Sequence, residues 1–222
     1  MPITRRMALL LATACPAYRS IAAEVPPLSP AQIALFETPH LASIKQPTRL
    51  SYAFRREEAG RAPVDDRIVL EVRRVSDDGR HDVHAEFLTG DRRINYPPAL
   101  GFKGNPLLLF ALDRESRELA SATGGSMNWF RGRFRRALVD EAETLQEQVK
   151  LAALPHAVAA QRIIVMPYGG EPRARRFQGL RYDFVLSGAV PGGILQMLTT
   201  VPAAEDGPAM AESITYSGSE AL

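Results

Sequence analysis

Cysteine is almost absent from this chain of 222 residues: Cys15 is the single one, and it lies in the N-terminal segment. If that segment is removed, the remaining chain has no thiol, so disulfide bonds and thiol catalysis are both excluded. Long apolar runs are also missing. The run Met7–Ala17 is shorter than the about 20 residues that a membrane-spanning helix needs, so no transmembrane segment is expected.

The sequence motifs of the common enzyme classes are missing as well. There is no Gly-x-Ser-x-Gly, no Walker-type loop and no Gly-x-Gly-x-x-Gly. Ser126 stands at a predicted helix start, where a capping hydroxyl explains it. We therefore expect a non-catalytic protein without a cofactor, although an acid/base pair assembled from distant loops stays open.

Charged residues alternate between positions 113 and 118, which is typical of a solvated, salt-bridged helix face. They are Asp113, Arg114, Glu115, Arg117 and Glu118. His81 and His84 are three residues apart on a predicted strand, where they face opposite sides, and His84 with Glu86 gives only two ligands. No metal site is predicted.

The N-terminus has the three parts of a secretory signal peptide. Arg5-Arg6 precede the apolar run, and small residues end at Ala23, so cleavage is expected before Glu24. Residues 1–23 are thus predicted to be a signal peptide and the mature protein to be periplasmic. The twin arginine leaves the folded-protein export route open. Lipoprotein anchoring at Cys15 is the less favoured alternative, because Ala12 stands where a lipobox usually has Leu.

Net charge gives no support for nucleic acid as a partner. The whole chain has 27 basic and 25 acidic residues; without the three arginines of residues 1–23 the count is 24 against 25, a net charge of −1. What remains, residues 24–222, is long enough for one domain with a real core, and no repeat or linker divides it.

The segment Asn105–Glu143 predicts two helices joined by a Gly-Gly turn. Asn105 and Pro106 suit a helix start, and Gly124 and Gly125 suit a helix end. In the second helix the apolar residues Met127, Phe130, Phe134 and Leu138 share one face, which leaves the arginines Arg131, Arg133, Arg135 and Arg136 on the remaining surface.

The rest of the chain alternates like β-strands, after a short helix that begins with a capping box at Ser29 and Gln32. Asp78-Gly79 predicts a tight hairpin between two of the strands. The predicted strands are 48–56, 67–76, 80–88, 146–151, 157–166, 180–187, 193–201 and 210–217. Grouped helices and short strand connections indicate an α+β fold: a curved antiparallel sheet, with a half-barrel as one form of it, and the helical pair packed on one face.

The motifs Thr123-Gly124-Gly125 with Phe130-Arg131-x-Arg133, Tyr182–Ser187 and Val190-Pro191-Gly192-Gly193 resemble those of a group of uncharacterised exported proteobacterial proteins, over roughly residues 35–217. The order of elements is also similar to that of periplasmic half-barrels of the lipoprotein-carrier type. That resemblance implies a curved sheet, plugged by helices, that binds acyl chains; it is an analogy of fold.

Two groups of arginines are the remaining feature: Arg131, Arg133, Arg135 and Arg136, then Arg173, Arg175, Arg176 and Arg181. One interpretation is a solvated surface. The other is a site for an anionic group, since a guanidinium binds carboxylate or phosphate through two hydrogen bonds.

Two functions of different class follow from these residues. In the first, the protein binds or carries an apolar, anionic ligand such as a lipid, with the arginines at the rim of a cavity and peripheral contact with a membrane. In the second, it is an accessory module that binds another envelope protein, with Trp129 as an interface anchor. An open apolar cavity would favour the first, and a filled interior with an exposed aromatic-arginine patch the second.

Overall fold

The computed structural model describes residues 27–205 and 207–222. The predicted signal peptide, with Cys15 and the expected cleavage position, lies outside these residues. One nine-stranded antiparallel sheet runs through the described chain. Its strands are β1 Thr48–Glu58, β2 Val64–Val75, β3 His81–Phe87, β4 Ala99–Phe102, β5 Glu143–Val149, β6 Val158–Val165, β7 Arg181–Leu186, β8 Ile194–Val201 and β9 Met210–Ala221.

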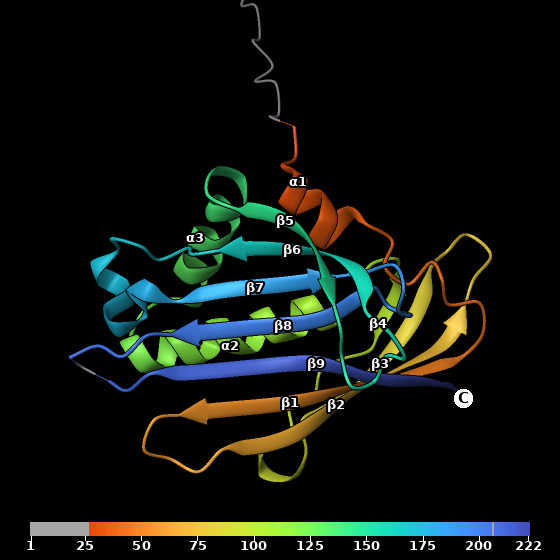
Figure 1. Cartoon of the computed structure of the whole chain (residues 1–222), viewed down its shortest axis with the longest axis horizontal. Coiled ribbons are helices and arrows are strands. Elements are labelled where there is room, and N and C mark those ends of the chain that lie inside the picture. The colour runs from red at the N-terminus through yellow and green to blue at the C-terminus, as the bar shows by residue number, and fades with distance from the viewer. Residues whose placement is uncertain (1–26, 206) are drawn as a thin grey trace, which may run out of the picture.

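The strands lie side by side in the order β4-β3-β2-β1-β9-β8-β7-β6-β5. The last strand, β9, thus joins two meanders, because it pairs with β1 on one side and with β8 on the other. β4 and β5 stand at opposite ends of the order, so the sheet is open. It is strongly twisted and curved, with α2 and α3 behind one face (Figure 1). The predicted α+β class, with the helical pair on one face of an antiparallel sheet, is confirmed.

Local sequence patterns determine where the strands and their turns form. Leu50, Tyr52 and Phe54 are buried on one face of β1, while Ala53 and Arg55 between and beyond them are exposed, as strand periodicity requires. The predicted hairpin between β2 and β3 is also confirmed. The amide of Ser76 donates to the carbonyl oxygen of Arg80 at 2.9 Å, and Gly79 has a φ of +77°.

The two predicted long helices are α2, Leu107–Thr123, and α3, Met127–Asp140. Gly124 ends α2 in the left-handed conformation, as predicted. The helix begins at Leu107, one position later than expected, yet the Asn105 side-chain oxygen still caps it by accepting from the Leu107 amide at 3.0 Å. Ser126 occupies the N-cap position of α3, but its side chain makes no capping hydrogen bond.

A short helical segment precedes the sheet and packs against the end of α3. Ser29 and Gln32 form the predicted capping box. The Ser29 hydroxyl also donates to the Leu138 carbonyl oxygen at 2.7 Å, which fastens this segment to α3. The segment consists of α1, Pro30–Gln32, and the π-helix η1, Ile33–Glu37; the remaining helical turns are the 3₁₀ segments η2, Gly90–Arg92, and η3, Pro172–Gly179.

The core lies between the sheet and the helical pair. Phe130 and Phe134 are buried, and Phe134 packs edge-to-face on Tyr182 and Phe184 of β7, with ring centres 5.3 and 6.0 Å apart. Arg131 and Arg135 are not buried. The face assigned to α3 from the apolar stripe is therefore correct at these positions.

The interpretation of residues 113–118 as a solvated face is wrong for Arg114. This residue is only 5% exposed and forms an ion pair with Glu212 of β9, with its guanidinium 5.2 Å from the centre of the Phe54 ring. Arg114 follows Leu107 by two helical turns, so it shares the face of α2 that lies on the sheet. A buried counter-ion on another strand makes this placement tolerable.

Candidate functional site

An apolar cavity of about 640 Å³ lies between α2 and α3, with α1 and η1 on one side. We call it the helix cavity. Its apolar lining consists of Leu28, Phe36, Tyr96, Pro97, Leu109, Phe110, Leu112, Phe134, Leu138, Tyr168 and Tyr182. The volume and the predominance of apolar side chains are typical of sites for small organic ligands, which range from about 300 to 1,000 Å³.

Ion pairs and stacked rings hold the walls of the helix cavity in place. Asp113 of α2 pairs with Arg131 of α3, and it also accepts a hydrogen bond from Nε of Arg117 at 2.8 Å. The Tyr96 ring stacks on Phe110 with ring centres 4.4 Å apart, and its hydroxyl donates to the Phe110 carbonyl oxygen at 2.8 Å. The segment before β4 is thereby fixed against α2.

The floor of the helix cavity, on the side of the sheet, consists of Tyr168 and Tyr182. Both are nearly inaccessible, at 1% and 3% exposure. Tyr182 lies beside the carboxyl group of Glu115, and burial is the largest cause that raises the pKa of the Tyr182 hydroxyl. Burial likewise raises the pKa of Tyr168. Both hydroxyls therefore stay protonated over the whole physiological range of pH.

Glu115 also departs from the expectation of a solvated helix face, since it is only partly exposed. Burial, first, and the neighbouring Glu212 carboxylate, second, raise the pKa of its carboxyl group to about 8, while Arg114 opposes the rise. The Thr199 hydroxyl also interacts with it from β8. At neutral pH Glu115 is thus mostly an uncharged acid, which places a hydrogen-bond donor next to the two tyrosines.

The mouth of the helix cavity combines arginines with exposed apolar side chains. Arg117, Arg131 and Arg135 line it, together with the carboxylates of Asp113 and Glu37. Arg135 makes no ion pair with the described residues, whereas Arg117 and Arg131 share Asp113. The exposed apolar residues at the same place are Leu28, Phe36 and Leu109, which are 49%, 36% and 43% exposed.

Of the first predicted arginine group, Arg131 and Arg135 line the helix cavity and Arg133 and Arg136 do not. Arg136 is exposed. Arg133, which was expected on the surface, is partly exposed: its side chain is 17% exposed and its guanidinium lies 3.1 Å from the carboxylate of Glu171, just before η3. This ion pair joins α3 to the segment before η3.

The second predicted group lies on and after η3 and does not line the helix cavity. Arg173 and Arg175 are exposed, Arg176 packs over the Phe177 ring at 5.0 Å, and Arg181 pairs with Asp183. Glu171, two residues before Arg173, forms the ion pair with Arg133 of α3. A composite anionic site made of both groups stays a prediction.

Trp129, the predicted interface anchor, is half-buried. Its ring stacks on Tyr168 at 6.1 Å and meets Phe130 edge-to-face at 4.8 Å. It therefore supports the floor of the helix cavity from behind, and a role in an interface stays a prediction.

Sequence reasoning missed Tyr168, Tyr182 and Glu115, which come together only in the fold. One signal was present: residues 107–112 are six consecutive apolar residues, more than one face of a helix needs. The surplus side chains, Leu109 and Leu112 among them, line the helix cavity.

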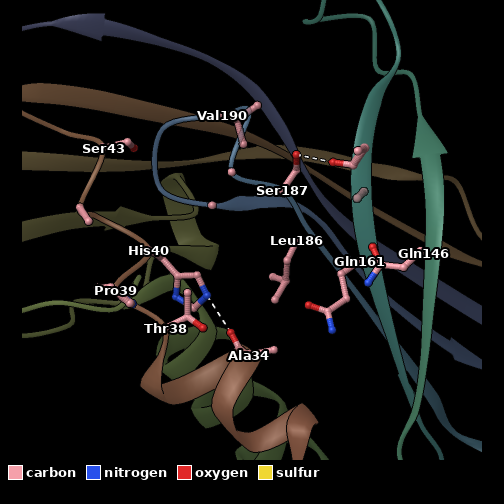
Figure 2. Close-up of a pocket in the computed structure, with 15 residues that line it drawn as sticks. Ala34, Thr38, Pro39, His40, Ser43, Gln146, Gln161, Leu186, Ser187 and Val190 are labelled. Atoms are coloured by element: carbon pink, nitrogen blue, oxygen red, sulfur yellow. Dashed lines mark hydrogen bonds between the residues drawn. The ribbon is translucent and has the colours of Figure 1, made fainter.

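A second, more polar cavity of about 480 Å³ lies between the segment after η1 and strands β5 and β6 (Figure 2). Gln146 and Gln161 are paired across the two strands and face it together. His40 donates from Nε2 to the Ala34 carbonyl oxygen at 2.9 Å, and burial lowers its pKa. The Ser187 hydroxyl donates to the Ala159 carbonyl oxygen at 2.6 Å. Because its histidine and serine are engaged with backbone groups, we take the helix cavity as the candidate site.

The described residues contain no group of three metal-ligating side chains. His81 is buried, with its two ring nitrogens each 3.1 Å from a carbonyl oxygen, those of Gly79 and Ile44. Within residues 27–205 and 207–222, no helix has both the length and the apolar composition to cross a bilayer.

Comparison of the sequence with protein-family models and with curated proteins gave no match. Among solved structures, the chain is similar to the crystal structure of a LolA superfamily protein from Nitrosomonas europaea. The two are 9% identical, and the likeness covers 86% of this chain and 93% of the other. The TM-score is 0.28, so the likeness carries no weight in the functional proposal.

Proposed function

We propose that this protein is a non-catalytic binding or carrier protein for an amphiphilic ligand, with an apolar body and an anionic group, such as a lipid. The observation that carries the proposal is the helix cavity: an open, mainly apolar space of about 640 Å³ with arginines at its mouth. The signal peptide expected from the sequence adds the periplasm as the place where the protein acts.

Burial of hydrocarbon in the helix cavity would supply most of the affinity. Removing apolar surface from water contributes about 25 cal/mol per Å², and Leu28, Phe36 and Leu109 are exposed where a ligand would cover them. The anionic group would lie at Arg135, whose guanidinium has no ion pair within the described chain. A charge-assisted hydrogen bond there would orient the ligand.

The alternative of an accessory module that binds an envelope protein has less support. It requires a filled interior and an exposed aromatic-arginine patch, whereas the interior contains the helix cavity and Trp129 is half-buried against Tyr168. No buried feature of the described fold points to an interface elsewhere on the surface.

Filling the helix cavity tests the proposal. Purified protein is titrated with palmitate, a probe with an apolar chain and a carboxylate, and binding is measured by calorimetry. Leu112→Trp, which places a larger side chain in the lining, should weaken binding at least tenfold. Val139→Trp is the matched control, because Val139 is exposed on α3 and does not line the cavity. Equal affinities of both variants and the wild type would refute binding at this place.

Two neighbouring arginines test the position of the anionic group. Arg135→Gln should weaken palmitate binding several-fold, and more strongly at low salt, because screening is then weak. Arg136→Gln should have little effect, since Arg136 lies outside the lining. Native mass spectrometry of protein purified from its own host would identify a retained ligand. Absence of palmitate binding together with absence of any retained amphiphile would exclude the proposed function.

A further inference from the structure

The exposed apolar side chains of the described chain are concentrated around the mouth of the helix cavity. Nine large apolar side chains are 36% exposed or more, and five of them belong to the segment 28–37, α2 and α3, which enclose this cavity. We call these five the apolar rim: Leu28, Ile33, Phe36, Leu109 and Val139. The other four are scattered over β4, β5, the residue after β6 and the C-terminus. A concentration of exposed apolar surface indicates a binding surface for a protein or a membrane.

Ile33 and Val139 extend the apolar surface beyond the cavity itself. Ile33 lies one turn before Glu37 in η1, and Val139 lies one turn after Arg135 in α3, and both Glu37 and Arg135 line the mouth. Residues one helical turn apart share a face, so Ile33 and Val139 lie beside the opening. They are 48% and 51% exposed and do not line the cavity. A ligand inside the cavity would leave them in water, so covering them requires a partner outside it.

Cationic side chains stand among the apolar ones. Arg117 pairs with Asp113, yet its side chain is 60% exposed, and Arg135 is exposed and makes no ion pair with a described residue. The lining of the mouth contains three arginines, with Arg131 as the third, against the two carboxylates of Asp113 and Glu37. The mouth therefore has a positive net charge, whereas residues 24–222 together have a net charge of −1.

Apolar side chains mixed with arginines suit an anionic bilayer. The apolar side chains enter the boundary between head groups and acyl chains, and a guanidinium binds lipid phosphate. Resting on the proposed function, we propose that the apolar rim, with Arg117 and Arg135, docks the helix cavity onto an anionic lipid bilayer. The ligand then passes between bilayer and cavity without exposing its hydrocarbon to water. A rigid protein face fits this surface less well, because it would have to match an open mouth to which fluid acyl chains adapt.

Co-sedimentation with vesicles tests the docking surface. An equimolar mixture of phosphatidylglycerol and phosphatidylcholine is compared with phosphatidylcholine alone. The wild-type protein should bind the anionic vesicles about tenfold more tightly, because two arginines then lie near lipid phosphates. This preference should shrink when the ionic strength rises from about 0.01 to about 0.1 M, since the Debye length falls from about 30 to about 10 Å. Equal binding to both vesicle types would overturn the proposal. Absence of binding to either would also overturn it and favour a protein surface as the partner.

A matched pair of variants locates the surface. Ile33 and Leu145 are 48% and 49% exposed, but only Ile33 belongs to the apolar rim, since Leu145 lies on β5. Ile33→Asp should weaken binding to anionic vesicles about tenfold or more, because it removes apolar contact and adds a negative charge. Leu145→Asp should leave vesicle binding nearly unchanged. Equal losses in the two variants would overturn the proposal. If Ile33→Asp fails to fold, as judged by circular dichroism, Val139→Asp takes its place, because Val139 is 51% exposed on α3.

The docking surface and the proposed function can fail separately. Neither Ile33 nor Val139 lines the helix cavity, so both variants should keep the wild-type Kd for palmitate. Palmitate binding without vesicle binding would overturn the docking surface and leave the proposed function standing. Vesicle binding that depends on Ile33, without palmitate binding, would support the docking surface and count against the proposed function.

Discussion

The side-chain amide of Asn105 donates a hydrogen bond to the Gly192 carbonyl oxygen, 2.8 Å away, and so joins the start of α2 to the turn between β7 and β8. The same amide donates to the Tyr52 hydroxyl at 3.1 Å. Asn105 is 3% exposed, and its side-chain oxygen caps α2. One buried side chain thus positions the helix that forms a wall of the helix cavity.

Gly192→Ala should disrupt this junction. Gly192 has a φ of +82°, and a Cβ there would lie 2.7 Å from Cδ1 of Leu50 and 2.9 Å from Nδ2 of Asn105. We expect the free energy of unfolding to fall by about 2–4 kcal/mol, from backbone strain and overpacking together. Gly188→Ala in the same turn is the control, because a Cβ at this exposed position would have no neighbouring atom within 4 Å. Urea unfolding measures the stability of both variants. Equal losses of stability would contradict the close approach of residue 192 to Leu50 and Asn105.

Phe134→Ala should destabilise the protein far more than Arg135→Ala. Phe134 is 7% exposed and packs on Tyr182 and Phe184, so its truncation should cost about 3–5 kcal/mol. Arg135 is exposed, so Arg135→Ala should lower the free energy of unfolding by under about 0.5 kcal/mol. Thermal and urea unfolding of the two variants give the comparison. Similar losses would mean that the buried face of α3 is assigned wrongly.

Sequence reasoning succeeded where a local rule determines the structure. The capping box of Ser29 and Gln32, the Asp78-Gly79 hairpin and the left-handed Gly124 each depend on residues within a few positions. Strand periodicity in β1 and the apolar stripe of α3 also follow from local spacing. These features therefore appeared in the structure with boundaries shifted by only a few residues.

Contacts between residues that are distant along the chain could not be predicted from the sequence. The insertion of β9 between β1 and β8 depends on pairing with distant segments, and the ion pair of Arg114 with Glu212 spans 98 residues. The candidate site shows the same division. Arg131 and Arg135 were predicted from their own helix, whereas Tyr168 and Tyr182 reach the cavity from other parts of the chain.

Asp66→Asn should destabilise the protein at neutral pH and not in acid. Thr89 Oγ1 donates to the carboxylate at 2.7 Å and Arg92 Nε at 2.8 Å. Burial is the largest single influence and would raise the pKa of Asp66, but the hydrogen bonds from Thr89, the Arg67 amide and Arg92 together lower it to about 2. Because the pKa is lower in the folded protein than the ordinary 3.8, the stabilisation is complete above about pH 4 and is lost as the pH falls toward 2.

We expect the Asp66 substitution to cost about 1–2 kcal/mol at pH 7, less than the full pKa shift would imply, because Arg92 is half exposed. Urea unfolding at pH 7 and at pH 2.5 should show the variant and the wild type converging in acid. Asp65→Asn is the control, since Asp65 is 68% exposed and should change stability by under about 0.5 kcal/mol. A cost that persists undiminished at low pH would rule out the charged form of Asp66 as its source.

Glu115→Gln should make the protein more stable in alkaline solution. Burial and the nearby Glu212 carboxylate raise the pKa of Glu115 to about 8, against an ordinary value of 4.5. Between these two values the folded protein holds a proton that the unfolded chain has released, so the free energy of unfolding falls as the pH rises. The stabilisation is fully present below about pH 4.5 and is lost as the pH passes through 8. Glutamine has nearly the same shape and no charge, and therefore removes this decline.

At pH 5 the Glu115→Gln variant and the wild type should have similar stability, and at pH 8.5 the variant should be more stable by on the order of 2–4 kcal/mol. Urea unfolding across this range, with Glu141→Gln as an exposed control on the surface after α3, measures the difference. Parallel curves for wild type and variant would mean that Glu115 is charged throughout and neutralised by Arg114.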